Sequence, residues 1–257
     1  MILYNSTHQP DFLIIGAQKC GTTSLFYYLS QHPDLNLPHT KEIHFFDLHY
    51  EKGIDWYKNN FLSADPFCNK LSGEASPYYL FHPLVPERVA MHLPNIKLIV
   101  MLRNPVDRAY SHFMHQRRLN NEPIDSFETA IAMEDLRTAG EEEKLQLGLI
   151  NESLPLRRYS YVNRGLYYRQ ISRWLKYFSI NQILFVKSED FFEYPILVFH
   201  EICDFLNIRR VIPLSMKPQN TNTYTEIMDI TRKHLNIRFN EDSRKLKALL
   251  VEKFSWV

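Results

Sequence analysis

The chain reads Phe12-Leu-Ile-Ile-Gly16-Ala-Gln-Lys-Cys-Gly21-Thr22-Thr23 close to its start. The first four residues form a short apolar run, which is typical of a buried strand. Two glycines then frame a loop, and a helix is expected from Thr22 to Gln31. Backbone N–H groups of such a loop, together with the helix N-terminus, form a cradle for an anion. The pattern indicates an α/β fold with a phosphate-binding loop, although an ordinary strand–helix turn can also begin with a glycine.

The loop nearly matches the G-x-x-x-x-G-K-[ST] motif of nucleoside triphosphatases. Thr22 stands where that motif has its lysine, and the cation lies inside the loop at Lys19. A triphosphatase would therefore lose its main contact to the β- and γ-phosphates. A P-loop-like cradle for one 5′-phosphate that carries a leaving group remains compatible with these residues.

A second informative segment begins with the apolar run Ile96–Leu102, which predicts a strand. Arg103 follows it at the carboxyl end, where open α/β sheets bind their ligands. The planar guanidinium suits bidentate phosphate contact. A helix is expected from Pro105, and Ser111 would lie two turns into it, able to donate to the same anion. An Arg–Asp pair beside an exposed serine is the alternative interpretation.

Further short strands are expected at 35–37, 70–73 and 183–186, with helices at 166–178 and 195–206. Buried strands that alternate with helices predict a central parallel sheet flanked by helices. We expect a single domain over residues 1–257. Residues 115–160 are polar and break the periodicity, so they are expected to form a helical excursion on the ligand side or a solvated helix pair.

The composition excludes several classes of protein. With 45% hydrophobic residues in 257, the chain is too apolar to be disordered. Its formal charge of +1 gives no reason to expect nucleic acid as a partner. Three scattered cysteines, without zinc-site spacing, favour a reducing compartment. No signal peptide or transmembrane segment is visible, and a cytoplasmic location is expected.

Residues 10–25, PDFLIIGAQKCGTTSL, and 97–113, KLIVMLRNPVDRAYSHF, together resemble the sulfotransferases that use 3′-phosphoadenosine 5′-phosphosulfate (PAPS). Lys41-Glu-Ile-His-Phe-Phe-Asp47 is similar to the K-E-x-H-F-F-D segment of the heparan-sulfate and bacterial branch. The resemblance continues through 73–77, 164–167 and 254–256. It implies a P-loop-like sulfotransferase fold, PAPS as the donor, adenosine 3′,5′-bisphosphate (PAP) as the product, and no metal.

The resemblance also implies how the donor is held. Lys19 would stabilise the charge that grows on the leaving phosphate. The 3′-phosphate would lie on Arg103 and Ser111. The remaining expected donor contacts come from the loop, its helix and two later segments: Cys20, Gly21, Thr22, Thr23, Ser24, Tyr167, Asn220 and Thr221.

On the acceptor side, Glu42 matches the family's catalytic glutamate. Apolar neighbours are expected to raise the pKa of this carboxyl and make it an effective base. His44 is the competing base or a second donor to the transferring group, although a lone histidine is more often structural. Asp47, Lys41 and Tyr78 are expected to bind or orient the acceptor, and a solvated lysine is the alternative for Lys41.

The sequence departs from the pattern of the heparan-sulfate sulfotransferases at two places. Ala75 stands where heparan-sulfate enzymes have lysine, and Gln219–Tyr224 replaces their K-G-R loop. The second change lies in the cofactor loop, where Asn220 and Thr221 are still expected to contact the nucleotide. Ala75 and the near-neutral charge argue against a long polyanion and favour a hydroxyl of a lipid, a polyketide-like compound or a small carbohydrate. The alternatives are an ATP-dependent phosphotransferase and an inactive nucleotide-binding protein. The oligomeric state is not predicted.

Overall fold

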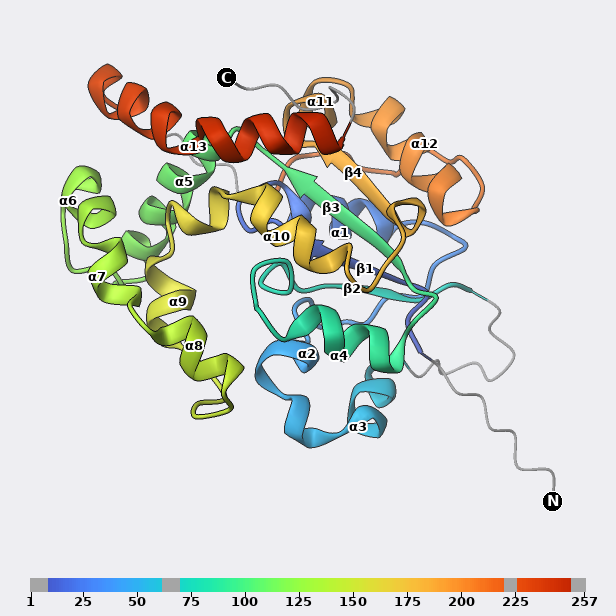
Figure 1. Ribbon diagram of the computed structural model, residues 1–257. Helices are drawn as coiled ribbons and strands as arrows, with labels where there is room; N and C mark the ends of the chain where they lie inside the picture. The colour runs from blue at the N-terminus through green and yellow to red at the C-terminus, as the bar shows by residue number, and fades with distance from the viewer. Residues whose placement is uncertain (1–8, 62–69, 220–225, 251–257) are drawn as a thin grey trace.

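A four-stranded parallel sheet forms the centre of the computed structural model, which describes residues 9–61, 70–219 and 226–250 (Figure 1). The strand order is β2-β1-β3-β4. Its strands are β1 (Phe12–Gly16), β2 (Gly73–Ala75), β3 (Lys97–Leu102) and β4 (Ile183–Lys187). The parallel pairings Phe12–Gly73, Leu13–Leu98 and Leu98–Ile183 fix the register. The predicted single α/β domain with a parallel sheet and flanking helices is confirmed.

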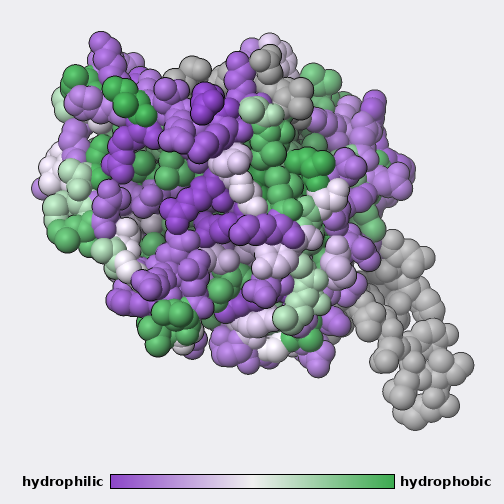
Figure 2. All heavy atoms as spheres, viewed as in Figure 1, coloured by the Kyte–Doolittle hydropathy of each residue, from purple (hydrophilic) through white to green (hydrophobic). Residues whose placement is uncertain are grey.

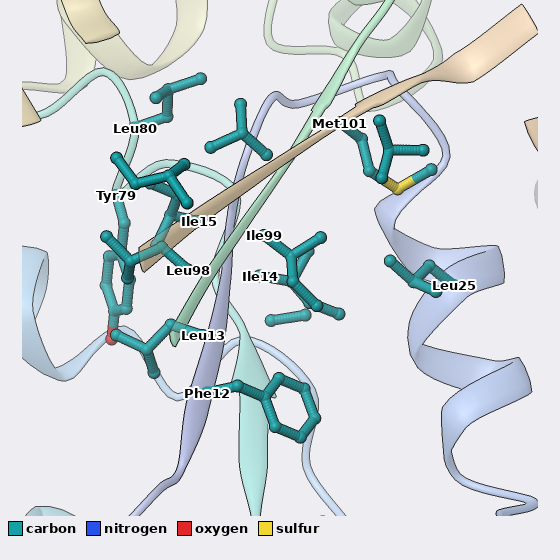
Figure 3. Packing of buried hydrophobic residues seen from close by; sticks show 14 of the residues in the cluster. Phe12, Leu13, Ile14, Ile15, Leu25, Tyr79, Leu80, Leu98, Ile99 and Met101 are labelled. Carbon is teal, nitrogen blue, oxygen red and sulfur yellow. The ribbon is translucent and has the colours of Figure 1, made fainter. Parts of the chain in front are cut away.

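Helices cover both faces of this sheet. Alternate residues of β1 point to opposite sides, Ile14 toward Leu25 of α1 and Leu13 toward Tyr79 (Figure 3). On the Tyr79 side, the indole of Trp174 in α10 donates to the Leu80 carbonyl at 3.3 Å. The α-helices are α1 (Thr22–Leu29), α2 (Phe45–Leu48), α3 (Ile54–Lys58), α4 (Val85–His92), α5 (Pro105–Arg118), α6 (Phe127–Ala132), α7 (Glu134–Thr138), α8 (Glu141–Gln146), α9 (Leu154–Tyr159), α10 (Tyr167–Trp174), α11 (Ser188–Glu193), α12 (Pro195–Leu206) and α13 (Asp229–Leu249). Short 3-10 turns occupy Tyr50–Lys52, Asn59–Phe61, Asn163–Gly165 and Ile180–Gln182.

The helix after β3 begins where the sequence predicts it. The Asn104 side chain accepts hydrogen bonds from the amides of Val106 and Asp107, and Pro105 occupies the first turn. This cap satisfies two of the amides that a helix start leaves free. It therefore holds α5 directly behind Arg103.

Several predicted boundaries are wrong. The expected strand at 35–37 is reduced to one parallel bridge between Leu35 and Leu71, and the strand expected at 70–73 begins only at Gly73. The helix expected at 166–178 runs only from Tyr167 to Trp174, and the Phe178 ring still packs on the Trp174 ring, with 5.6 Å between the ring centroids.

Residues 115–160 contain the end of α5 and the four short helices α6–α9, rather than a helix pair. α6 packs in a second hydrophobic cluster that includes Phe113, Phe127 and Tyr161, whereas α8 and α9 pack through Leu145 and Leu156 in a third. The face seen in Figure 1 is mostly hydrophilic with scattered apolar patches (Figure 2). Among the described helices, none is long and apolar enough to cross a membrane.

Candidate active site

The loop between β1 and α1 is fastened from three sides. The Ala17 amide donates to the Met101 carbonyl of β3 at 2.7 Å. The Ser188 hydroxyl, at the start of α11, donates to the Cys20 carbonyl at 2.6 Å. Gly21 has φ +91°, and a Cβ there would lie 2.9 Å from the Phe192 ring of α11. Only glycine combines this backbone conformation with so close a neighbour.

The loop opens onto a cavity of about 470 Å³, which we call the loop cavity. It brings together six of the predicted donor contacts: Lys19, Gly21, Thr22, Thr23, Arg103 and Ser111. Gln219 lines it as well, whereas the predicted contacts Asn220 and Thr221 lie outside the described residues. Two segments more than 75 residues apart in the chain thus surround one space, as expected for an anionic ligand.

Three predicted donor contacts lie behind the wall of the loop cavity. The Cys20 amide donates within the loop to Ala17, and its thiol is buried beside the Tyr167 hydroxyl. The Tyr167 hydroxyl donates to the Arg103 carbonyl at 2.9 Å. The Ser24 hydroxyl accepts from the Gln219 amide at 2.8 Å. These side chains do not line the cavity, and they position residues that do.

The loop cavity is electropositive. Lys19, Arg103 and Arg118 line it, against the carboxylates of Glu42 and Glu189. Burial, with the nearby charges of Arg118 and Arg103, lowers the pKa of Lys19 to about 8. Three cations with the hydroxyls of an N-terminal helix turn are a suitable donor set for more than one phosphate group.

A second cavity of about 250 Å³, which we call the side cavity, lies next to the first. Gln18, Glu42, Pro77 and His115 line both cavities and therefore mark their junction. Of the predicted acceptor residues, His44 and Tyr78 line the side cavity, while Lys41 and Asp47 do not.

Glu42, His44 and Asp47 form a chain of charged groups at this junction. His44 Nδ1 lies 2.8 Å from Asp47 Oδ2, and its Nε2 lies 3.3 Å from Glu42 Oε2. Lys41 forms an ion pair with the other Glu42 oxygen. Asp47 is thus placed as an orienting group for His44, and Lys41 as a partner of Glu42.

The contacts of Glu42 with His44 and Lys41 reverse the direction of the pKa shift that the sequence predicts for Glu42. Burial alone would raise it, but the hydrogen bonds and charges of His44 and Lys41 lower the pKa of Glu42 to about 2. Burial would lower the pKa of His44, yet Asp47 and Glu42 raise it to about 9. The prediction of a raised carboxyl pKa is wrong for the site without ligand. The raised pKa favours the protonated form of His44 at neutral pH, which fits the expected role of a donor better than that of a base.

The backbone marks the same residues. Among the described non-glycine residues, five have positive φ, and three of these are Lys19 (72°), Glu42 (64°) and His44 (55°). Left-handed backbone at such residues costs free energy and persists only where surrounding contacts enforce it. Its concentration around one junction supports a functional role for all three.

A buried network enforces the backbone of residues 42–46, which we call the catalytic turn. Tyr79 Oη accepts from the amides of Phe45 and Phe46 at 2.9 and 3.3 Å and donates to Glu74 Oε1 at 2.8 Å. Glu74 Oε2 accepts from the Ile43 amide at 3.3 Å. Glu74 is fully buried, and burial raises the pKa of its carboxyl. The turn leads into α2, and hydrogen bonds to the segment that contains and follows β2 hold its backbone in place.

His115 is a junction residue that the sequence analysis missed. Burial, with the charges of Lys19 and Arg118, lowers the pKa of His115 to about 4, so its imidazole is neutral at pH 7. It lies four residues after Ser111 on α5, and residues at this spacing share one helix face. The spacing of four residues between Ser111 and His115 is the feature of the sequence that points to His115.

Comparison with known proteins agrees with this geometry. The sulfotransferase domain family matches residues 9–245. The crystal structure of a sulfotransferase from Alicyclobacillus acidocaldarius is 31% identical, with a TM-score of 0.78 over 96% of this chain and 97% of that one.

Two curated relatives are longer proteins. The membrane-associated sulfotransferase kil1 of Dictyostelium discoideum is 29% identical over 96% of this chain and 66% of its own length. The human bifunctional heparan sulfate N-deacetylase/N-sulfotransferase 1 is 34% identical over 79% of this chain and 22% of its own length. The chain thus spans about two thirds of the first and about a fifth of the second. With the glycine-framed loop, the arginine after β3 and this match over nearly all of its length, the chain belongs to the sulfotransferase family.

Proposed function

We propose that the protein transfers a sulfuryl group from PAPS to an acceptor hydroxyl at the junction of the two cavities. The observation that carries this proposal is that Glu42 lines both the loop cavity and the side cavity. A group that is transferred in line between two ligands has to cross the place where their cavities meet, and Glu42 lies at that place.

The residues present fit the donor. The amides of Gly21–Thr23 at the start of α1, with Lys19, suit the 5′-phosphosulfate, and Arg103 with Ser111 suits the 3′-phosphate. Ser24 and Tyr167 would act from behind, by holding Gln219 and Arg103 in place. The same set fits ATP less well, because Thr22 replaces the lysine that a triphosphatase needs.

The chemistry is a displacement at sulfur. The acceptor oxygen forms a bond to sulfur as the bond from sulfur to the bridging phosphate oxygen breaks, and that oxygen keeps the electron pair. Lys19 stabilises the charge on the leaving phosphate. The acceptor hydroxyl gives its proton to Glu42. Since the pKa of Glu42 is about 2 before ligands bind, we infer that the acceptor hydroxyl displaces Lys41 or His44 from this carboxylate and so raises its basicity.

Among the acceptor classes expected from the sequence, the side cavity favours a small carbohydrate or another compact polar alcohol. Its volume of about 250 Å³ is below the range of about 300–1,000 Å³ usual for ligand pockets. Its lining includes arginine, histidine, glutamine and tyrosine side chains. A long lipid chain would find little apolar surface there.

We place the enzyme in the cytoplasm. Cys20 and Cys203 are free, buried thiols, which suits a compartment that keeps cysteines reduced.

The decisive experiment compares nucleotide binding and transfer. By calorimetry without magnesium, PAP should bind at least about tenfold more tightly than ATP, and labelled PAPS should pass its sulfuryl group to a hydroxyl acceptor. Arg103→Ala should weaken PAP binding by at least tenfold, because it removes a charge-assisted contact. Arg210→Ala, whose ion pair with Asp204 is remote from both cavities, is the control. Tighter binding of ATP would support the phosphotransferase instead, and PAP binding without any transfer would support an inactive binding protein.

A further inference from the structure

The side cavity contains buried polar atoms that have no partner among the described residues. They are the Tyr78 hydroxyl, the Gln116 carbonyl oxygen and the Arg164 Nε, from side chains that are at most 5% exposed. All three residues line the side cavity. Because buried polar groups are nearly always hydrogen-bonded, three such atoms mark this wall as polar and unsatisfied just beneath its surface.

The wall of the side cavity also carries excess positive charge. Arg157, Arg158 and Arg164 line it, and Glu42 is the carboxylate that faces them. Arg157 forms an ion pair with Glu152. Arg164 donates only to the Gln18 side chain and to backbone carbonyls. Arg158 is half-buried and forms no ion pair with any described residue. Two guanidinium groups thus lack a carboxylate.

Glu42 does not neutralise this charge. Its oxygens already pair with Lys41 and with His44, and with Asp47 on the other nitrogen of His44 these four groups balance one another. His115, on the remaining wall, is neutral at pH 7. The electrostatic balance of the side cavity therefore favours an anion on the side of α9, opposite the junction.

We propose that the acceptor carries a carboxylate or a similar small anionic group on the same ring or short chain as its reacting hydroxyl. Arg158 binds the anion, the buried Arg164 adds positive charge behind it, and the hydroxyl reaches Glu42. This inference rests on the proposed function and names its substrate class. A single local anion is consistent with a chain whose overall charge is near zero, because the attraction comes from the cavity wall and not from the global field.

A matched pair of probes tests this inference. With the enzyme saturated with PAP, 4-nitrophenyl β-D-glucuronide and 4-nitrophenyl β-D-glucoside are titrated by calorimetry. They differ in one carboxylate. The glucuronide should bind at least about tenfold more tightly, the factor expected for one charge-assisted contact. Arg158→Gln should bring the two affinities within about threefold, and Arg210→Gln should keep the preference. Raising the ionic strength should weaken the preference, since the charge is only partly buried.

Equal affinities, tighter binding of the glucoside, or no measurable binding of either probe would overturn the inference. A preference that survives in Arg158→Gln would overturn the role of this arginine. PAP affinity is measured first in every variant. Its loss would count against the donor assignment of the proposed function, whereas retained PAP binding without a glucuronide preference would count against this inference alone.

Discussion

Lys19 is half-buried beside the positive charges of Arg118 and Arg103, and its pKa is about 8. It supports the leaving phosphate only when protonated, so kcat/KM for the donor should fall as the pH rises through about 8. Bound phosphates favour the charged form, and the fall in kcat should therefore occur at a higher pH than the fall in kcat/KM. Initial rates at limiting and at saturating donor, measured from pH 6 to 10, check this.

Lys19→Arg provides the control for this pH dependence. Arginine stays protonated throughout the range, so the fall near pH 8 should disappear and leave the one that His44 sets near its pKa of about 9. An unchanged pH profile in Lys19→Arg would mean that a group other than Lys19 causes the fall in kcat/KM near pH 8.

Glu42→Gln keeps the size of the side chain and removes its ability to take a proton. Turnover should fall at least about 100-fold, the lower range for general acid–base catalysis, while PAP affinity is retained. Transient kinetics with labelled PAPS separates the rate of sulfuryl transfer from the affinity for the nucleotide. If Glu42→Gln turns over normally and His115→Asn does not, the proton goes to the neutral imidazole of His115 instead.

At the scale of elements, the catalytic turn depends on its contacts with the β2 segment. Tyr79→Phe removes the acceptor of two turn amides and a donor to Glu74. We expect kcat to fall about tenfold, since small misplacements of catalytic groups are costly, with PAP affinity unchanged. The unfolding free energy should fall by about 1–3 kcal/mol, because buried polar groups lose a partner.

Tyr161→Phe is the matched control for this change. Its hydroxyl also donates to a buried carboxylate, that of Glu122, but within the second hydrophobic cluster. Urea unfolding should show a similar loss of stability, while kcat stays near the wild-type value. Equal losses of kcat in the two variants would show that Tyr79 affects activity only through stability.

The elements differ in how far the sequence predicts them. β1, β3 and α5 are recognisable because an apolar run, an asparagine cap and a proline determine them locally. The left-handed backbone of Glu42 and His44 has no local signal, since it is enforced by side chains more than 30 positions away. The resemblance to sulfotransferases singled out these residues, but the shape of their turn and their pKa values required the tertiary contacts.

At the scale of the whole molecule, the two cavities have different origins. The loop cavity lies at the carboxyl ends of neighbouring strands, and its main residues could be predicted because parallel sheets place ligands there. The side cavity forms where α9 and the end of α5 meet the catalytic turn. Arg158 and Gln116 belong to a stretch without a recognisable motif. Their grouping depends on how the excursion packs, which periodicity does not encode.

The left-handed backbone of Lys19, Glu42 and His44 creates a trade-off between thermal stability and catalytic turnover. Each costs about 1 kcal/mol or more relative to a residue that tolerates this backbone. Glycine would relieve the cost at all three positions and remove the groups that act on the substrates. Selection for thermal stability alone would therefore favour glycine at these positions first and remove catalytic activity. Selection for activity keeps the three strained residues in place.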